Sequence, residues 1–74
     1  MDNKPRNGQI VWFSYNSKEF IGAYNEDKDT FWNTSKEDFL KLVLEHKTTV
    51  IPIGANIFVG HAVEWWKPYE LGGH

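Results

Sequence analysis

The chain has 74 residues, no cysteine, a formal net charge of −2 and 16% aromatic residues. The lack of cysteine excludes disulfides and thiolate metal sites, and the slight acidity argues against the basic face that nucleic-acid binding requires. A single core of this size supplies only about 3–5 kcal/mol of stability, so we expect dense aromatic packing or self-association to reinforce it.

The first half of the chain predicts an arm and three strands. Residues 1–8 are polar and contain a proline and a glycine, which indicates an extended arm and a turn. Residues 9–15 and 19–25 are rich in β-branched and aromatic side chains, and the short polar stretch between them predicts an antiparallel hairpin. Residues 29–33 give a short third strand. Gly22 lies in mid-strand, where glycine marks a bulge, a bend or a close backbone approach.

Residues 34–47 change period and predict a helix. Thr34 and Glu37 match a capping box, and His46 supplies a charge suited to the helix C-terminus. Leu42 widens the apolar stripe beyond half of the helix circumference, so the helix is either deeply buried or keeps an apolar edge. The stripe, which is expected to face the core, consists of Phe39, Leu40, Val43 and Leu44.

The segments after the helix predict further strands. Residues 48–53 read as a strand, and Pro52 places it at a sheet edge or a bulge because proline cannot donate to a ladder. Residues 57–66 read as one bent strand, or as two short strands broken at Gly60, and Pro68 ends this stretch.

The predicted order is strand-strand-strand-helix-strand-strand, which defines an α+β domain. We expect a single domain over residues 1–74, built on a small, strongly curved antiparallel sheet with one helix. An SH3-like barrel satisfies the same pattern. The tail at 71–74 is expected to be disordered. No stretch is apolar enough to span a membrane or to serve as a signal core, so a cytoplasmic protein is expected.

The sequence predicts neither catalysis nor a cofactor. It has no cysteine nucleophile, no nucleophile elbow and no phosphate-binding glycine loop. His61 and Glu64 offer a metal half-site, but residues three apart on a regular strand point to opposite faces. The charged stretch 26–29 lacks the ligand spacing of a calcium loop and reads as a solvated turn.

Aromatic side chains are the remaining candidates for a site. They either pack a core or line a groove for a peptide, another subunit or a flat ligand. Trp65 and Trp66 are adjacent and point to opposite sides of a regular strand, so only one of them fits a one-sided core. The candidate aromatic binding residues are Trp12, Tyr24, Trp32, Trp65 and Tyr69.

Two segments, KPRNGQIVWF at 4–13 and AVEWWKPYE at 62–70, carry short motifs near the ends of the chain. They resemble a family of small phage and prophage domains of unknown function, which open with Leu-Pro-x-x-Gly-x-x-Val and close with Val-Thr-His-Trp-Met-Pro. The resemblance implies a compact β-rich fold, a phage or mobile-element origin and no established activity. It also implies that Trp66 packs in the core, which leaves Trp65 and Tyr69 as surface candidates. The matching residues are Pro5, Gly8, Val11, Val63, Trp66 and Pro68.

We therefore expect a non-enzymatic, phage- or prophage-encoded binding module that engages a host protein or its own copies through these aromatics and Leu42. The alternative is an oligomer that sequesters a small nucleotide-derived ligand in an anti-defence role, with Arg6, Lys18 and Lys67 facing the phosphates. A third hypothesis is single-stranded nucleic-acid binding on the sheet, which the aromatics favour and the net charge opposes.

Overall fold

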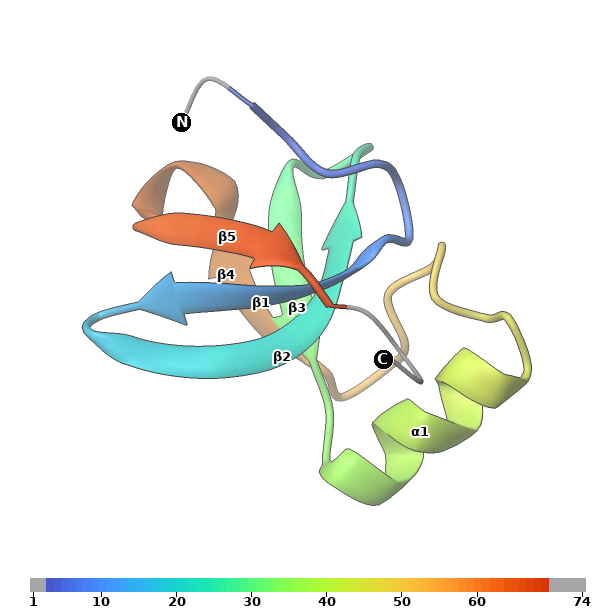
Figure 1. The fold of residues 1–74 in the computed structure, drawn as a ribbon. Helices are drawn as coiled ribbons and strands as arrows, with labels where there is room; N and C mark the ends of the chain where they lie inside the picture. Colours follow the sequence, from blue (N-terminus) through green and yellow to red (C-terminus); the bar gives the residue numbers. More distant parts are fainter. Residues whose placement is uncertain (1–2, 70–74) are drawn as a thin grey trace.

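β1 (Ile10–Tyr15) and β2 (Lys18–Asn25) form an antiparallel hairpin from which the rest of the sheet extends (Figure 1). The structure is a computed structural model that describes residues 3–69. At the turn between the strands, Asn16 and Ser17 have φ values of 54° and 65°. Two positive φ values are typical of a type I′ turn, whose twist matches that of the strands. The predicted hairpin is confirmed.

The remaining elements complete a small α+β domain. The sheet has five strands in the order β4-β3-β2-β1-β5, and all neighbouring pairs are antiparallel. The predicted fold class is therefore confirmed. The sheet does not close into a hydrogen-bonded barrel, because β4 and β5 are its two edges. The further elements are β3 (Thr30–Asn33), α1 (Lys36–Leu44), β4 (Asn56–Val59), a 3-10 helix (Gly60–Ala62) and β5 (Trp65–Pro68).

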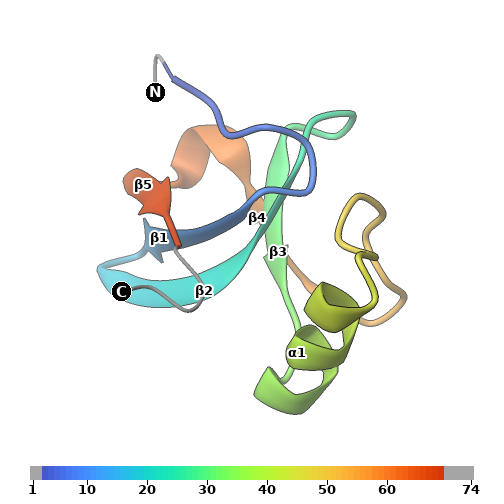
Figure 2. The same ribbon diagram turned by 45° about the vertical axis from the view of Figure 1, so that its right-hand side comes forward.

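The sheet has an apolar cluster on each face. Figure 2 shows α1 beside β3 and away from β5, so the helix covers only part of the outer face. The outer core, beneath α1, consists of Ala23, Trp32 and Phe39. The inner core, on the opposite face, consists of Val11, Phe13, Tyr24, Phe31 and Val63.

Aromatic packing reinforces the inner core. The Phe13 ring lies 5.6 Å from Phe20, 5.1 Å from Phe31 and 5.0 Å from Phe58, measured between centroids. β1 and β4 are not neighbours in the sheet, so the contact between Phe13 and Phe58 shows how strongly the sheet curves. Such ring pairs contribute about 0.5–1.5 kcal/mol each beyond the area they bury, which is substantial for a domain this small.

Gly22 lies where β2 passes very close to β3. A Cβ atom at this position would lie 2.1 Å from the carbonyl oxygen of Trp32 and 2.9 Å from Cε1 of Phe13. Of the roles predicted for a mid-strand glycine, the structure therefore shows the close backbone approach.

The first turn of α1 begins later than predicted. Ser35 is the N-cap, and its hydroxyl accepts a hydrogen bond from the Asp38 amide at 3.3 Å. The Thr34 hydroxyl instead donates to the Ser35 carbonyl oxygen. The predicted capping box of Thr34 and Glu37 is wrong by one residue, because serine and threonine are adjacent here and both are competent caps.

The end of α1 is a Schellman motif, so the helix is shorter than the predicted 34–47. The Lys47 amide donates to the Leu42 carbonyl at 2.8 Å, and the His46 amide donates to the Val43 carbonyl at 3.1 Å. His46 has a φ of 57°. This left-handed conformation costs a residue with a Cβ atom about 1–2 kcal/mol, which is why glycine usually occupies the position.

We expect His46→Gly to stabilise the domain by about 0.5–1 kcal/mol, because glycine adopts the left-handed conformation without strain. Urea denaturation would measure the gain. His46→Ala is the matched control, since it removes the imidazole and retains the Cβ atom. An equal gain in both variants would contradict the backbone explanation.

The prediction of a strand over residues 48–53 is wrong. The Thr48 hydroxyl donates to the Gly8 carbonyl at 2.8 Å, and the Asn25 side-chain amide donates to the Thr49 carbonyl at 3.3 Å. These contacts tie the segment to the N-terminal arm and to β2 as a loop. Pro52 cannot donate a hydrogen bond to a neighbouring strand, and residues 48–53 do not pair with any strand of the sheet.

β4 and the first half of β5 come from the stretch predicted over 57–66, and β5 continues through Pro68, which was expected to end that stretch. Of the two alternatives for this stretch, the structure shows two short strands broken at Gly60. The Gly60 amide donates to the Asp29 carbonyl at 2.9 Å, and a Cβ atom on Gly60 would lie 2.6 Å from that oxygen. The predicted number of strands is thus correct, although one of them was misplaced.

The N-terminal arm, residues 3–8, packs along the sheet. The Gly8 amide donates to the Tyr24 carbonyl at 2.7 Å, and the Trp66 indole N–H donates to the Asn3 carbonyl at 2.9 Å. The arm therefore connects β2 with β5. The predicted disordered tail at 71–74 lies outside the described residues.

Candidate functional site

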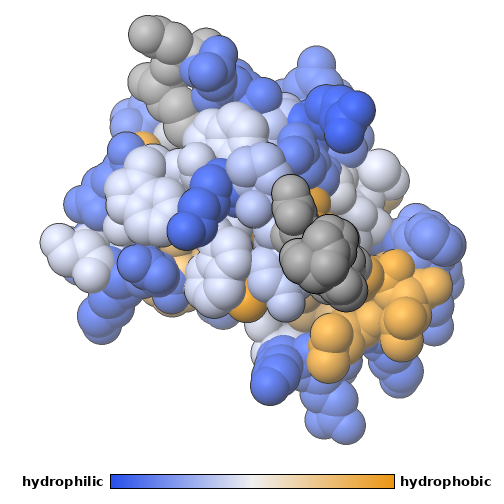
Figure 3. All heavy atoms as spheres, in the orientation of Figure 1, coloured by the Kyte–Doolittle hydropathy of each residue, from blue (hydrophilic) through white to orange (hydrophobic). Residues whose placement is uncertain are grey.

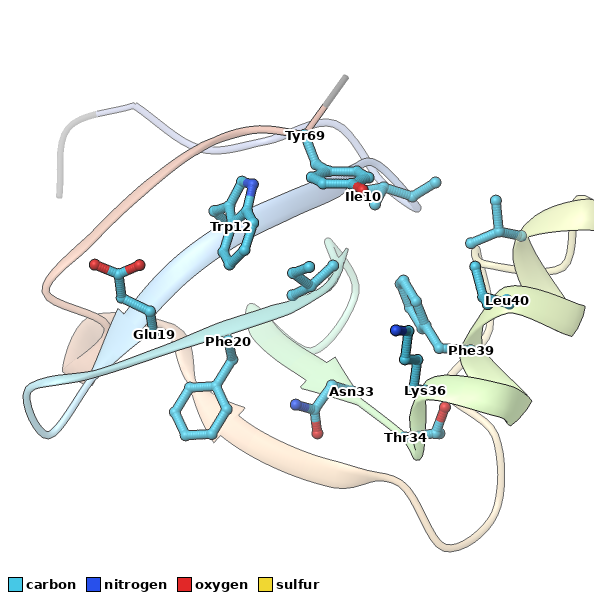
Figure 4. Close-up of a pocket in the computed structure, with 12 residues that line it drawn as sticks. Ile10, Trp12, Glu19, Phe20, Asn33, Thr34, Lys36, Phe39, Leu40 and Tyr69 are labelled. Carbon is cyan, nitrogen blue, oxygen red and sulfur yellow. The ribbon is translucent and has the colours of Figure 1, made fainter. Parts of the chain in front are cut away.

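A groove of about 460 Å³ lies between α1 and the part of the outer sheet face that the helix leaves uncovered (Figure 4). Its walls are mainly apolar, and a few polar side chains stand among them. The lining residues are Ile10, Trp12, Glu19, Phe20, Ile21, Asn33, Thr34, Lys36, Phe39, Leu40, Val43 and Tyr69.

The sheet wall of the groove follows from strand alternation. Ile10 and Trp12 are two apart on β1 and share its outer face, and Trp12 is paired in register with Ile21 of β2. Tyr69 follows β5 and is positioned by its amide, which donates to the Ile10 carbonyl at 3.1 Å. Its ring meets Trp12 edge-on, with centroids 5.8 Å apart and planes at 64°. Trp12 and Tyr69 thus form one aromatic end of the groove.

The helix wall is formed by Phe39, Leu40 and Val43. Phe39 is buried in the outer core, whereas Leu40 is 48% exposed and Leu44, one turn further on, is 79% exposed. Figure 3 shows a hydrophobic area over α1 in the orientation of Figure 1. The exposed apolar edge of the helix is therefore centred on Leu40 and Leu44.

Leu42, the helix residue predicted to contact a partner, packs against the outer core and is only partly exposed. The residues that turn toward the sheet are Phe39, Leu42 and Val43, with the i, i+3, i+4 spacing of a helix face. Leu40 was not predicted as a site residue, because the apolar stripe that contains it was expected to face the core. The spacing of Phe39 to Leu42 and Val43 was the signal that could have identified it.

Two predicted binding residues belong to the core instead. Tyr24 is 1% exposed in the inner core, and Trp32 is 0% exposed in the outer core. Tyr24 is buried on the inner face of β2, and Trp32 is buried on the outer face of β3 beneath α1, so both are inaccessible to a partner. Their assignment to a binding surface is therefore corrected.

Trp65 and Lys67 lie on the outer face of β5, beside the groove but not in its lining. Trp65 is 39% exposed, and the Lys67 ammonium lies 5.8 Å from the centroid of its ring. Trp66 points to the other side and packs against the inner core. Together with Trp12 and Tyr69, Trp65 extends the aromatic surface across β1 and β5.

The three basic residues predicted to face phosphates do not form a cluster. Lys18 is paired with Tyr15 at the hairpin end of β1 and β2. Arg6 is in the N-terminal arm, near the opposite end of these strands, where its amide bonds to Gln9. Among the described residues that line the groove, Lys36 is the one cation.

Polar side chains at the rim of the groove give it a mixed charge. Glu19 comes from β2 and Lys36 from the first turn of α1, so one charge of each sign is present. Asn33 accepts a hydrogen bond from the Asn56 side chain at 2.9 Å, which fixes its amide. The groove therefore suits a mainly apolar ligand that carries a few polar groups.

Tyr24, Asp29 and Lys4 form a hydrogen-bonded group at the turn between β2 and β3. The Tyr24 hydroxyl donates to Asp29 at 2.5 Å, and the Lys4 ammonium lies 3.2 Å from the other carboxylate oxygen. The bond from Tyr24, followed by that from Lys4, holds the pKa of Asp29 below its ordinary value of 3.8. Burial and the same bond raise the pKa of Tyr24. The group fastens the N-terminal arm to the inner core.

The stability of the domain is expected to fall as the pH drops below about 4, because a carboxyl with a lowered folded pKa stabilises only while it is ionised. This contribution is fully present above the unfolded pKa of Asp29 and is lost as the pH passes down through the folded pKa. Asp29→Asn should remove it without backbone strain, since asparagine tolerates the φ of 52°. The melting temperatures of the wild type and of Asp29→Asn should differ at neutral pH and converge in acid. A constant difference at all pH values would contradict this role.

The structure defines a small α+β domain in which one helix partly covers a curved antiparallel sheet and borders an apolar groove. Comparisons with family models, curated proteins and solved structures give no match to this chain. Within residues 3–69, no group of three or more His, Cys, Asp or Glu side chains is placed to hold a metal ion. No helix in that part of the chain has the length and apolar character needed to cross a membrane.

Proposed function

We propose that the chain is a non-enzymatic binding module and that the groove between α1 and the β1–β2 hairpin contacts a partner protein. The observation that carries this proposal is an apolar groove of about 460 Å³ bordered by Trp12, Leu40 and Tyr69. Tryptophan and tyrosine side chains are among the usual anchors of protein recognition. The partner is expected to be a host protein that inserts apolar side chains.

The charges around the groove favour a partner segment of balanced charge. Glu19 and Lys36 stand at the rim with opposite signs, and Lys67 lies on the adjoining face of β5. Rim charges of this kind contribute more to orientation and association rate than to affinity. The partner is therefore selected mainly by the apolar side chains that enter the groove.

A small flat ligand is the second candidate, since the groove falls within the range of about 300–1,000 Å³ typical of small-molecule sites. The separation of Arg6, Lys18 and Lys67 does not favour a phosphate-rich ligand, and the net charge does not favour single-stranded nucleic acid. A thermal-shift screen should then find stabilisation by uncharged aromatic compounds rather than by nucleotides.

The experiment that tests the groove uses Leu40→Glu, with Leu44→Glu as the matched control. Both leucines are exposed on α1, but only Leu40 lines the groove. Proteins retained from a bacterial lysate by the wild type and by Leu44→Glu, and lost with Leu40→Glu, would be specific partners. Because a buried leucine contributes about 1.5–3 kcal/mol, binding of the purified partner should weaken by at least about tenfold. Equal binding by all three proteins would refute the proposal.

A phage or prophage origin and a cytoplasmic location stay predictions that rest on the sequence resemblance and on composition. The binding proposal does not depend on either. It depends on the side chains at the groove.

A further inference from the structure

The two edge strands of the sheet, β4 and β5, have four residues each but differ in how well they are protected against pairing with another chain. On β5, the Tyr69 amide bonds to β1. Strand alternation therefore turns the backbones of Trp66 and Pro68 to the free edge, where Pro68 has no N–H to offer. Lys67 adds a charge to this strand. Proline and lysine are devices that prevent a free edge from pairing with another chain.

The β4 edge carries no such protection. The Gly60 amide bonds to Asp29 at the end of β3, so alternation directs the Phe58 backbone to β3 as well. The N–H and C=O groups of Ile57 and Val59 are therefore directed to the free edge. Their side chains are 50% and 46% exposed. The strand, Asn-Ile-Phe-Val, contains neither a charged residue nor a proline.

We propose that β4 pairs with β4 of a second copy, antiparallel and around a twofold axis at Phe58. Ile57 and Val59 carry the free backbone groups, so the register that uses all of them places Ile57 opposite Val59 of the partner. Each such pair exchanges both N–H···O bonds, and the twofold axis generates an identical second pair. The result is one continuous sheet across two protomers.

A second copy is the occupant that the strand itself favours. An uncharged strand such as β4 pairs with its own copy without like-charge repulsion. Two copies of β5 would instead bring two Lys67 charges together. In this register the β-branched side chains of Ile57 and Val59 are cross-strand neighbours, a combination that stabilises sheets. The two Phe58 residues face each other across the axis in a non-hydrogen-bonded pair, while each ring stays packed on the inner core of its own protomer.

This interface is separate from the proposed groove. β4 and β1 are on opposite sides of the β2–β3 pair in the strand order, and none of the β4 residues lines the groove. Dimerisation therefore leaves the groove of each protomer open. A groove that binds no partner would not contradict the dimer, and a monomeric protein would not contradict partner binding at the groove.

The decisive variant is Val59→Pro. Val59 has a φ of −62°, close to the value of about −65° that proline imposes, and its N–H faces the free edge rather than β3. The monomer should therefore keep its circular dichroism spectrum and melting temperature. Each dimer would lose both symmetry-related Val59 donors, which predicts a dissociation constant at least about 30-fold higher. Val59→Thr keeps the N–H and the β-branched shape and should remain dimeric.

Sedimentation equilibrium of the wild type across a dilution series, together with both variants, gives the answer. A wild-type dimer that Val59→Pro dissociates and Val59→Thr preserves would support the proposal. A monomeric wild type, or a dimer that Val59→Pro leaves intact, would overturn it. If Val59→Pro fails to fold, Ile57→Lys replaces it, because it brings one charge per copy to the edge and should weaken the dimer similarly. Dissociation by Leu40→Glu and not by these edge variants would place the interface at the groove and refute the edge pairing.

Discussion

Gly22→Ala should unfold the domain. The Cβ atom would lie 2.1 Å from the Trp32 carbonyl oxygen, a backbone atom that cannot move unless β2 and β3 separate. Overpacking a well-packed core costs about 1–3 kcal/mol and occasionally more, and the whole domain has only about 3–5 kcal/mol to lose. Circular dichroism and urea titration would show an unfolded or barely folded chain.

Gly54→Ala is the control that separates steric clash from backbone strain. Gly54 has a φ of 88°, yet a Cβ atom there would meet nothing within 4 Å. Its replacement should therefore cost only the conformational strain of about 1–2 kcal/mol and leave the protein folded. Equal loss of stability in both variants would show that the contact between β2 and β3 is not the cause.

Trp32→Ala is expected to have a similarly large effect. Trp32 is fully buried and meets Phe39 of α1 with ring centroids 5.6 Å apart, so it supports the helix on the outer face. Truncation of a buried tryptophan costs about 3–5 kcal/mol, which equals the expected stability of the domain. Loss of the helical signal in far-ultraviolet circular dichroism, together with a lowered melting temperature, would confirm the prediction.

Trp32→Phe should retain the fold with a loss of about 1–2 kcal/mol. The indole N–H of Trp32 is buried and has no hydrogen-bond partner among the described residues. An unsatisfied buried donor costs about 1–3 kcal/mol, so its removal offsets part of the lost packing. A Trp32→Ala variant as stable as the wild type would show that Trp32 is not a core residue. It would then be a candidate for the binding surface, as the sequence predicted.

Local signals predicted the parts of the fold that depend on local chemistry. The polar residues before Lys18 indicated the hairpin turn, and the change of period after Asn33 indicated the helix. The loop at 48–53 was misread because its β-branched residues favour a strand, whereas its actual partners are the arm and Asn25, which are distant in sequence. Propensity does not encode such contacts.

The candidate site was predicted only in part for the same reason. Trp12 and Tyr69 were identified as candidates, and the structure brings them together at the groove. Tyr24 and Trp32 were indistinguishable from them by residue type, since exposure is decided by which strands become central and where the helix rests. The helix position also decides that Leu40, and not Leu42, is at the open edge.

The position of β1 between β2 and β5 determines when the sheet can be completed. β1 spans residues 10–15, but one of its two partners comes from residues 65–68. Until β5 arrives, one side of β1 lacks its neighbour and the Trp66 ring is missing from the inner core. Pairing of such distant segments slows folding because the long loop must close before its contacts are made. On the ribosome, the sheet of the nascent chain would therefore remain incomplete until β5 has been released from the exit tunnel.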